Sequence, residues 1–355
     1  MPTSAAVIPL VVPGPVRIRA WQDSDEAAWD AFVLAHPDGT FFHLSGWKQV
    51  IETVHRHRTH FLVAEQNGEL CGVLPLAEVR SFLFGASLVS LPFCVYGGPL
   101  AVDSEVTEAL VNEACSLAEK LSVDHLELRS QQPVPQELPT KDLYVTFRKP
   151  VSQDHDENLK AVPRKQRAMI RKGIKAGLEA VEETDTRNLY ACYSESQRNL
   201  GTPVFTRRHL EALVNAFPKH SQVLTVMHDG QPVSSVLSFF FRDEVLPYYG
   251  GGLAAARGCY ANDFMYWEVM QRAVERGVAV FDYGRSKEGT GSYRFKKHWG
   301  FEPTPLHYQY HLVKATQMPN LSPTNPRYQK AINTWKRLPV AVTNVVGPPL
   351  ARFLG

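Results

Sequence analysis

The stretch "HFLVAEQNGELCGVLPL", residues 60–76, decides the fold class, because its pattern occurs again in the second half of the chain. It consists of an apolar run, an Asn67-Gly68 turn and a second apolar run, which is the pattern of a β-hairpin. The stretch "QVLTVMHDGQPVSSVLSFF", residues 222–240, has the same pattern around Asp229-Gly230. This repetition indicates that two parts of the chain share one supersecondary structure.

The segments after the two hairpins also correspond. "CVYGGPL" (94–100) and "PYYGGGL" (247–253) each precede a segment with helical periodicity, and each helix leads to a strand that ends in Arg-Ser. We therefore predict two copies of one domain of mixed α/β (α+β) class. The expected boundaries are 15–150 and 151–316, and a chance alternation of helices and strands is the alternative.

Composition excludes several classes of protein. The 355 residues carry a formal net charge of only +2, so nucleic-acid binding would have to depend on local clusters. The five cysteines are widely spaced and form no C-x-x-C pair, which disfavours a zinc knuckle or a disulfide framework. The apolar residues 5–15 are few, interrupted by proline and not preceded by basic residues, so we expect neither a signal peptide nor a membrane span. These features favour a cytoplasmic protein.

A basic helix is expected at residues 163–176, between the two copies. Pro163 suits the first turn of a helix, and the segment contains no acidic residue. Guanidinium groups bind phosphate oxygens in pairs, so the functional interpretation is a phosphate site that faces the cleft between the domains. The alternative is a solvated surface whose charge is balanced by glutamates downstream. The basic residues of "LKAVPRKQRAMIRKGIKAG", residues 159–177, are Lys160, Arg164, Lys165, Arg167, Arg171, Lys172 and Lys175.

The second basic segment is "FDYGRSKEGTGSYRFKKHWGFEP", residues 281–303. Its glycines, aromatic residues and cations could form either a solvated loop or the wall of a pocket for an anionic substrate. No nucleophile or nucleotide-binding motif occurs in the chain, which leaves direct transfer between two bound substrates as an open mechanism. His55, His57 and His60 lie close together in sequence, but the interleaved arginines disfavour a metal site.

The segment 317–355 falls outside both copies. Tyr328, Ile332, Trp335 and Leu338 recur at helical spacing with basic residues between them, which predicts an amphipathic helix. The helix could pack on the second domain or lie peripherally at the inner surface of a membrane.

Taken together, these motifs resemble those of the FemAB family. The resemblance rests on "LPFCVYGGPL", "PRKQRAMIRKGIKAGL", "NLGTPVF" and "FDYGRS…YRFKKHWGFEP", and it spans nearly the whole chain. The tail "NPRYQKAINTWKRLPVAVTNVVGPPL" is similar to the branch associated with exosortase/PEP-CTERM exopolysaccharide systems. The resemblance implies two tandem GNAT-like acyltransferase domains.

The family resemblance also implies an activity. Members transfer amino acids from aminoacyl-tRNA to an amine of a peptidoglycan precursor, and basic residues hold the precursor's diphosphate. We therefore expect an N-aminoacyl or N-acyl transferase for a diphosphate- or carboxylate-bearing glycan or peptide precursor, with aminoacyl-tRNA or acyl-CoA as donor and no tightly bound cofactor or metal. The chain lacks the long heptad insertion of the staphylococcal enzymes, and "AARGCYAND" (255–263) stands where a coenzyme A pyrophosphate signature would lie. A non-catalytic scaffold and an RNA-binding protein are the alternatives.

Site residues follow from the same resemblance. Arg285 and Lys296 would hold phosphate or carboxylate, with Lys296 or its neighbour Lys297 facing the pocket and Tyr283 beside them. Asp263 is a candidate general base, and a helix cap is its alternative role. The expected substrate-binding residues are Arg164, Lys165, Arg167, Arg171, Tyr96, Thr202, Tyr249, Tyr293, Lys297 and Trp299.

Overall fold

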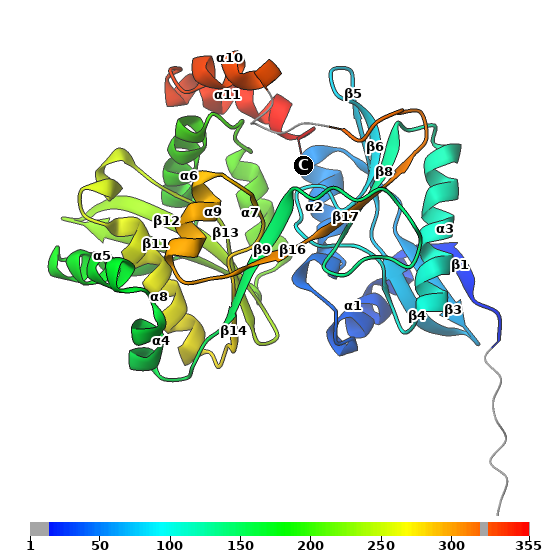
Figure 1. Cartoon of the computed structure of the whole chain (residues 1–355), viewed down its shortest axis with the longest axis horizontal. Helices are drawn as coiled ribbons and strands as arrows, with labels where there is room; N and C mark the ends of the chain where they lie inside the picture. Colours follow the sequence, from blue (N-terminus) through cyan, green and yellow to red (C-terminus); the bar gives the residue numbers. More distant parts are fainter. Residues whose placement is uncertain (1–13, 320–325, 355) are drawn as a thin grey trace, which may run out of the picture.

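The computed structural model describes residues 14–319 and 326–354 (Figure 1). Two α/β units lie side by side, and the last two helices cross one edge of the molecule. Residues 5–13 of the apolar N-terminal segment, residues 320–325 of the predicted tail and the side chain of Tyr328 lie outside the described residues.

The C-terminal unit is built on one sheet with the order β10-β11-β12-β13-β14-β9-β15. Strands β10 to β13 are antiparallel neighbours, whereas β13 and β14 are parallel and are joined by the crossover helix α8. β16 pairs with β9. The strands are β9 (Tyr144–Pro150), β10 (Glu179–Glu183), β11 (Ser221–His228), β12 (Gln231–Phe241), β13 (Glu244–Gly252), β14 (Val280–Asp282), β15 (Ser286–Lys287) and β16 (Pro303–Pro305).

The N-terminal unit repeats this plan in two smaller sheets, β1-β3-β4-β7 and β17-β8-β6-β5-β2. Here β4 and β5 take the place of the single long strand β12, because the chain leaves the strand at Pro75-Leu76. The strands are β1 (Arg17–Ala20), β2 (Arg58–Thr59), β3 (Leu62–Gln66), β4 (Glu69–Leu74), β5 (Ala77–Ser81), β6 (Gly85–Ser90), β7 (Leu100–Ala101), β8 (His125–Ser130) and β17 (His307–Leu312).

The predicted duplication is confirmed by the strand pairing. The order β3, β4/β5, β6, β8 corresponds to β11, β12, β13, β14, and both sets end in a parallel pair connected through one helix. That helix is α3 (Ser104–Lys120) in the first unit and α8 (Ala261–Glu275) in the second. The two predicted hairpins turn at Asn67-Gly68 and Asp229-Gly230, where all four residues have positive φ.

The two units exchange strands across the predicted boundary at residue 150. β9 was assigned to the first unit, but it pairs with β14 in the second. β17 was assigned to the second unit, but it pairs with β8 in the first. The C-terminal unit is thus continuous, residues 144–305, and it interrupts an N-terminal unit whose last strand comes from 307–312. Hydrophobic periodicity could not reveal the exchange, since a strand's apolar pattern does not specify its neighbour.

Helices cover the sheets in a corresponding order. Along the chain, α1 and α2 lie between the paired strands β1 and β3, and α6 and α7 lie between the paired strands β10 and β11. Of the described helices, none combines the length and the apolar character needed to cross a membrane. The remaining helices are α1 (Glu26–Ala35), α2 (Gly46–Val50), α4 (His155–Ala161), α5 (Arg164–Lys175), α6 (Arg187–Leu200), α7 (Arg207–Ala216), α9 (Gly291–His298), α10 (Pro326–Trp335) and α11 (Val340–Ala351), with short turns at Asp23–Asp25, Phe41–His43, Ile51–His55 and Ala254–Arg257.

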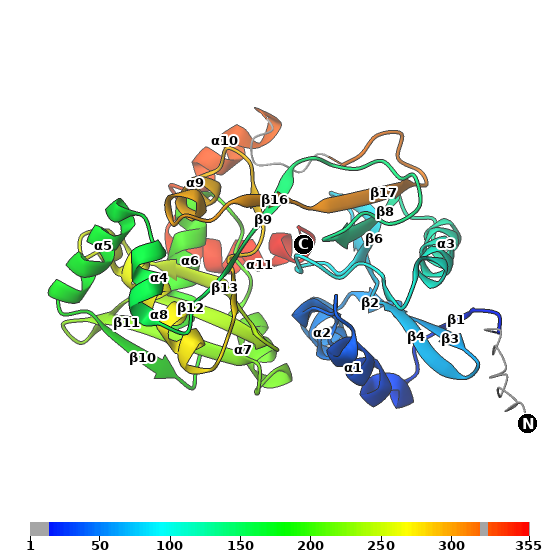
Figure 2. The same cartoon turned by 60° about the horizontal axis from the view of Figure 1, so that its bottom comes forward.

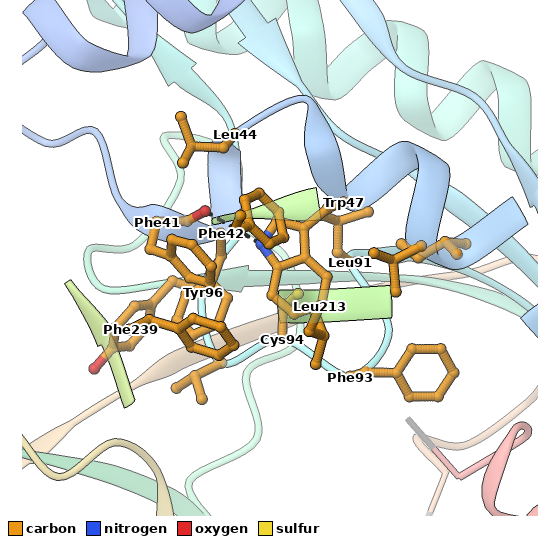
Figure 3. Packing of buried hydrophobic residues seen from close by; sticks show 14 of the residues in the cluster. Phe41, Phe42, Leu44, Trp47, Leu91, Phe93, Cys94, Tyr96, Leu213 and Phe239 are labelled. Atoms are coloured by element: carbon orange, nitrogen blue, oxygen red, sulfur yellow. Dashed lines mark hydrogen bonds between the residues drawn. The ribbon is translucent and has the colours of Figure 1, made fainter. Parts of the chain in front are cut away.

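An aromatic core joins the two units (Figure 3). The ring of Phe41 stacks on Phe239 with centroids 4.3 Å apart and meets Phe217 edge-on at 4.7 Å. Gly46 permits this approach, because a Cβ there would lie 2.7 Å from the Phe217 ring. Hydrogen bonds cross the same interface, including one of 2.7 Å from Tyr248 Oη to the carbonyl oxygen of Phe93. A buried apolar interface of this kind holds the units in a fixed relation.

Candidate functional site

A cleft opens in the C-terminal unit where β13 and β14 separate. Among the described residues, these strands pair only at Glu244–Val280 and Val245–Phe281. A bulge at Tyr248 shifts the register of β13 against β12, since Leu237 faces Tyr249 whereas Ser238 faces Pro247. The cleft has a volume of about 580 Å3, which lies in the range typical of small-molecule sites.

The walls of the cleft come from several elements. α6 contributes Tyr193 and Gln197, while α9 contributes Phe295 and Lys296. The glycines of β13 let α6 approach closely, because a Cβ on Gly251 would lie 2.4 Å from the Ser196 side chain. The cleft also reaches the N-terminal unit at Phe93 and Val95 and the C-terminal segment at Ala351 and Leu354.

Lys296 is a buried cationic side chain in the wall of the cleft. Its side chain is only 8 % exposed, and its Nζ donates hydrogen bonds of 2.8 Å to the Gly284 carbonyl and 3.0 Å to the Arg285 carbonyl. Burial lowers its pKa to about 7, and the nearby Arg285 cation acts in the same direction, against the opposing Asp282 carboxylate. A lysine in this state can exchange a proton at neutral pH.

A sharp turn at the end of β14 presents the two carbonyl groups to Lys296. Gly284 has φ +65°, and its N–H donates a 2.6 Å hydrogen bond to the Asp282 carboxylate. Asp282 is fully buried and also accepts a 3.0 Å hydrogen bond from Tyr96. Burial raises the pKa of Asp282, although the positive charge of Arg148 opposes this shift.

Arg285 supplies a fixed positive charge to the cleft wall. Its guanidinium lies 4.7 Å from the centre of the Tyr144 ring and 5.6 Å from that of Tyr308, and it donates a 3.1 Å hydrogen bond to Tyr308 Oη. Among the described residues, no carboxylate lies within ion-pair distance of this guanidinium. Arg285 is half-buried, and an arginine held by aromatic rings in this way can bind a phosphate or carboxylate of a ligand.

Two buried polar atoms in the cleft wall lack a protein partner. Tyr283 Oη and Asn262 Oδ1 are both buried without a hydrogen bond in the part of the chain that the structure describes. Buried polar atoms are nearly always paired, so these two are available to a ligand or to water.

Five of the predicted site residues meet in this cleft. Lys296 lines it, whereas Lys297 is exposed and lies 3.9 Å from Glu302. The segment 281–303 thus forms part of a pocket wall. The five predicted residues in the cleft are Lys296, Tyr283, Arg285, Thr202 and Tyr249.

Other predicted residues have structural positions. Trp299 is fully buried in the core, where its Nε1 donates a 3.0 Å hydrogen bond to Asp263. Asp263 therefore points away from the cleft and does not cap α8, whose N-terminus has no side-chain cap. Tyr96 is buried between the units, and Tyr293 packs edge-on against Phe147 at 5.3 Å. Trp299, Tyr96, Tyr293 and Asp263 are not among the residues that line the cleft, so their positions lend no support to the predicted substrate-binding roles or to Asp263 as a general base.

The basic helix α5 is also displaced from its predicted position. It lies at the outer end of the C-terminal unit, away from the N-terminal unit, and packs on α8 through Gly173 and Phe264 (Figures 1 and 2). The prediction that it faces the cleft between the domains is therefore wrong. Its charges remain unneutralised, since no ion pair to Arg164, Lys165, Arg167 or Arg171 occurs within residues 14–319 and 326–354.

The histidines at 55, 57 and 60 do not converge. His55 Nε2 lies 2.9 Å from Nδ1 of His209, whereas His60 contacts Glu78 at 3.3 Å. Throughout the described ranges, no group of three or more His, Cys, Asp or Glu side chains is arranged to hold a metal ion.

Comparisons with known proteins agree with this architecture. Residues 164–297 match the model of the acetyltransferase (GNAT) domain family. The structure is similar to the crystal structure of FemX, with a TM-score of 0.64 and 15 % identity over 89 % of this chain and 100 % of that one. The chain has the tandem GNAT fold.

A tandem GNAT protein from the clavulanic acid biosynthesis pathway is a second similar structure. It has a TM-score of 0.56 and 13 % identity, over 85 % of this chain and 100 % of that one. A conserved protein of unknown function from Bacteroides thetaiotaomicron has a TM-score of 0.56 and 12 % identity, over 84 % of this chain and its own full length. A search of curated protein sequences finds no match.

The sequence did not point to several lining residues. Tyr193, Gln197 and Asn262 belong to helical segments whose polar positions look like ordinary solvated surface. The glycine run of residues 250–252 is a usable signal: it belongs to the repeat, and "GGGLAAARG" resembles a phosphate-binding loop only weakly, since it lacks the lysine of such loops. Glycine inside a strand often marks a bulge or a place where a ligand approaches the backbone.

Proposed function

We propose that this chain is an N-aminoacyl or N-acyl transferase whose reaction takes place between β13 and β14. The observation that carries the proposal is Lys296, a buried amine with a pKa of about 7 in the wall of a cleft of small-molecule size. The GNAT-domain match and the tandem GNAT fold support the same class of reaction.

The proposed reaction is a direct transfer. The acceptor amine attacks the acyl carbonyl carbon, an N–C bond forms, and the thioester C–S bond or the ester C–O bond of the donor breaks. Neutral Lys296 takes the proton that the attacking nitrogen loses, and the leaving thiolate or alkoxide receives a proton in return. Because both carbonyl hydrogen bonds are donated by Lys296, its lone pair is left for this proton.

Binding is proposed to depend on positive charge. Arg285 would bind a phosphate or carboxylate of the acceptor inside the cleft, consistent with a diphosphate- or carboxylate-bearing cell-envelope or exopolysaccharide precursor. The exposed face of α5 would bind phosphates of the larger substrate, such as an aminoacyl-tRNA donor. The resemblance of the sequence motifs to the FemAB family motivates this choice of donor and acceptor classes, and FemX is similar to this chain in fold.

The test is a transfer assay with purified protein. Labelled aminoacyl-tRNA and acyl-CoA donors are each incubated with amine-bearing glycan and peptide precursors, and the acylated product is detected by mass spectrometry. We expect transfer from one donor class by the wild-type chain. If neither donor is consumed with any of the acceptors, the proposal is overturned. That result would favour the alternative of a non-catalytic scaffold in an exopolysaccharide assembly system.

A further inference from the structure

One edge of the molecule exposes large apolar side chains on two separate elements. The tip of the β5–β6 hairpin presents Phe82 and Leu83, which are 105 % and 70 % exposed. On α11, Val345 is 73 % exposed, and Val342 and Val346 are each 42 % exposed. Both elements stand at the top edge in Figure 1. Exposed apolar groups gathered in this way mark a contact surface.

The apolar face of α11 is not explained by the packing of the helix. Its inner face is formed by Thr343, Gly347 and Ala351, which are buried. A Cβ on Gly347 would lie 3.0 Å from the backbone of Val204, so this face already sits directly on the C-terminal unit. The helix contains no charged residue, yet its valine face is open to solvent. A helix that is apolar on every side normally has a partner on every side.

The charged side chains next to this surface are all positive. Residues 317–355 contain no Asp or Glu, and the exposed Lys330, Lys336 and Arg337 lie on α10 and on the turn before α11. Gly201, at the end of α6, packs against Ile332 and Lys336, which fixes α10 on the C-terminal unit. Valines and leucines flanked by lysine and arginine suit a layer of anionic lipid, where apolar groups enter the acyl region and cations meet headgroups.

We propose that the β5–β6 tip and the outer face of α11 dock together on an anionic lipid bilayer. The hairpin belongs to the N-terminal unit, whereas α11 packs on the C-terminal unit. Both stand on one edge, which suits a flat surface better than a single bound peptide. The docked segment also reaches the cleft, since Ala351 and Leu354 line it. Docking would hold the cleft next to substrates in the membrane, although docking itself does not depend on the transfer reaction.

Vesicle flotation with the full chain tests the proposal. Wild-type protein should bind vesicles that contain about 30 % phosphatidylglycerol and bind phosphatidylcholine vesicles much more weakly. Two double variants, Phe82→Ser/Leu83→Ser and Val345→Ser/Val346→Ser, should each weaken partitioning by at least about tenfold. A control double variant, Ile174→Ser/Val181→Ser, removes side chains that are 53 % and 44 % exposed on α5 and β10 and should bind like wild type.

Three results would overturn the docking surface. One is the absence of a preference for anionic vesicles, and another is an equal loss of binding in the control variant. The third is a wild-type dimer in sedimentation velocity that the Phe82→Ser/Leu83→Ser change dissociates, which would assign the patch to a second copy of the chain. Circular dichroism of each variant confirms that it is folded. A chain that docks but transfers nothing would contradict the proposed function alone.

Discussion

Two equivalent arginines have different surroundings in the duplicated units. Both belong to an Arg-Ser pair: Arg129 and Ser130 end β8, whereas Arg285 follows β14 and Ser286 begins β15. The guanidinium of Arg129 donates to the carbonyl oxygens of Leu91 and Cys94 and pairs with Glu127 at 2.8 Å, so it is occupied by its own unit. In that unit β6 and β8 stay paired as far as Ser90, the last residue of β6, whereas the pairing of β13 with β14 ends at Val245. Arg285 instead faces a cleft.

Replacing Lys296 should abolish turnover and leave the fold intact. Lys296→Met keeps the length and apolar stem of the side chain but removes the group that takes the proton. We expect a loss of about 100-fold or more in kcat, the range typical of general-base removal. The matched control is Lys297→Met, whose side chain is exposed beside Glu302. Equal activity in both variants, measured with the donor found in the transfer assay, would exclude Lys296 from the reaction.

The activity should rise with pH through the pKa of Lys296. Only the neutral amine accepts a proton, and the pKa of about 7 means that this form is minor at pH 6 and dominant at pH 8. The measurement is kcat/KM between pH 5.5 and 9, with Asp282→Asn as comparison. The Asp282 carboxylate raises the pKa of Lys296, so its removal should move the midpoint to lower pH. A profile that falls across this range would contradict the assignment.

The sequence predicted that Lys296 or Lys297 lines a pocket, but it could not tell which of the two does so, nor which aromatic residues belong to the core. Lys296 and Lys297 are adjacent on α9, and the rotation of about 100° between neighbouring helical residues leaves the first buried and the second exposed. The family resemblance places Trp299 and Tyr96 in the substrate site, but aromatic residues also dominate cores, and both side chains are buried. An aromatic residue in a pocket wall differs from one in a core only by its packing in three dimensions, and a single sequence does not reveal that packing.

At the scale of elements, periodicity in the sequence predicted which segments form strands and helices. It did not predict where these elements lie relative to one another. The basic helix was correctly expected after Pro163, because the segment has helical spacing and a suitable first residue. Its position depends on the contact of Gly173 with Phe264, which joins residues far apart in the chain. Such a contact gives no local pattern.

The charged face of α5 can be tested independently of the cleft. Arg167→Glu/Arg171→Glu should weaken binding of a phosphate-rich ligand, such as tRNA, by about tenfold or more, because each lost phosphate contact removes electrostatic attraction. Since no ion pair to either arginine is described, the melting temperature should change little. Fluorescence anisotropy at two salt concentrations measures the effect, with Arg187→Glu on the exposed surface as control. Unchanged affinity would identify α5 as ordinary solvated surface.

At the scale of the molecule, the exchanged strand β17 links the stability of the two units. Tyr310 is 2 % exposed, and its strand completes the sheet of the N-terminal unit beside β8. Tyr310→Ala should cost about 3 kcal/mol by leaving a cavity, whereas Thr304→Ala on exposed β16 should cost little. Hydrogen exchange should accelerate in β8 of the Tyr310→Ala variant. Acceleration confined to residues 144–305 would contradict the exchange of strands.

Buried histidines make the contact between the units sensitive to acid. Burial lowers the pKa of His55 to about 2 and that of His209 to about 3, and these residues come from opposite units. Between pH 6.5 and about 3 the unfolded state binds protons that the folded state does not, so stability falls as pH decreases. Each such histidine contributes up to about 1.4 kcal/mol per pH unit. Denaturant unfolding measures the free energy of unfolding at pH 7 and at pH 5.5. The loss between these two pH values should be smaller for His209→Gln than for wild type. An equal loss would show that His209 does not cause the acid sensitivity.

The order of the strands has a consequence for synthesis on the ribosome. The C-terminal unit, residues 144–305, is synthesised as one uninterrupted segment. It can form its complete sheet as soon as β16 has left the ribosomal exit tunnel. The unit that begins first must wait, because its sheet lacks β17 until residues 307–312 are made. We therefore expect the second half of the newborn chain to acquire its native structure before the first, and the early segment to depend longest on chaperones.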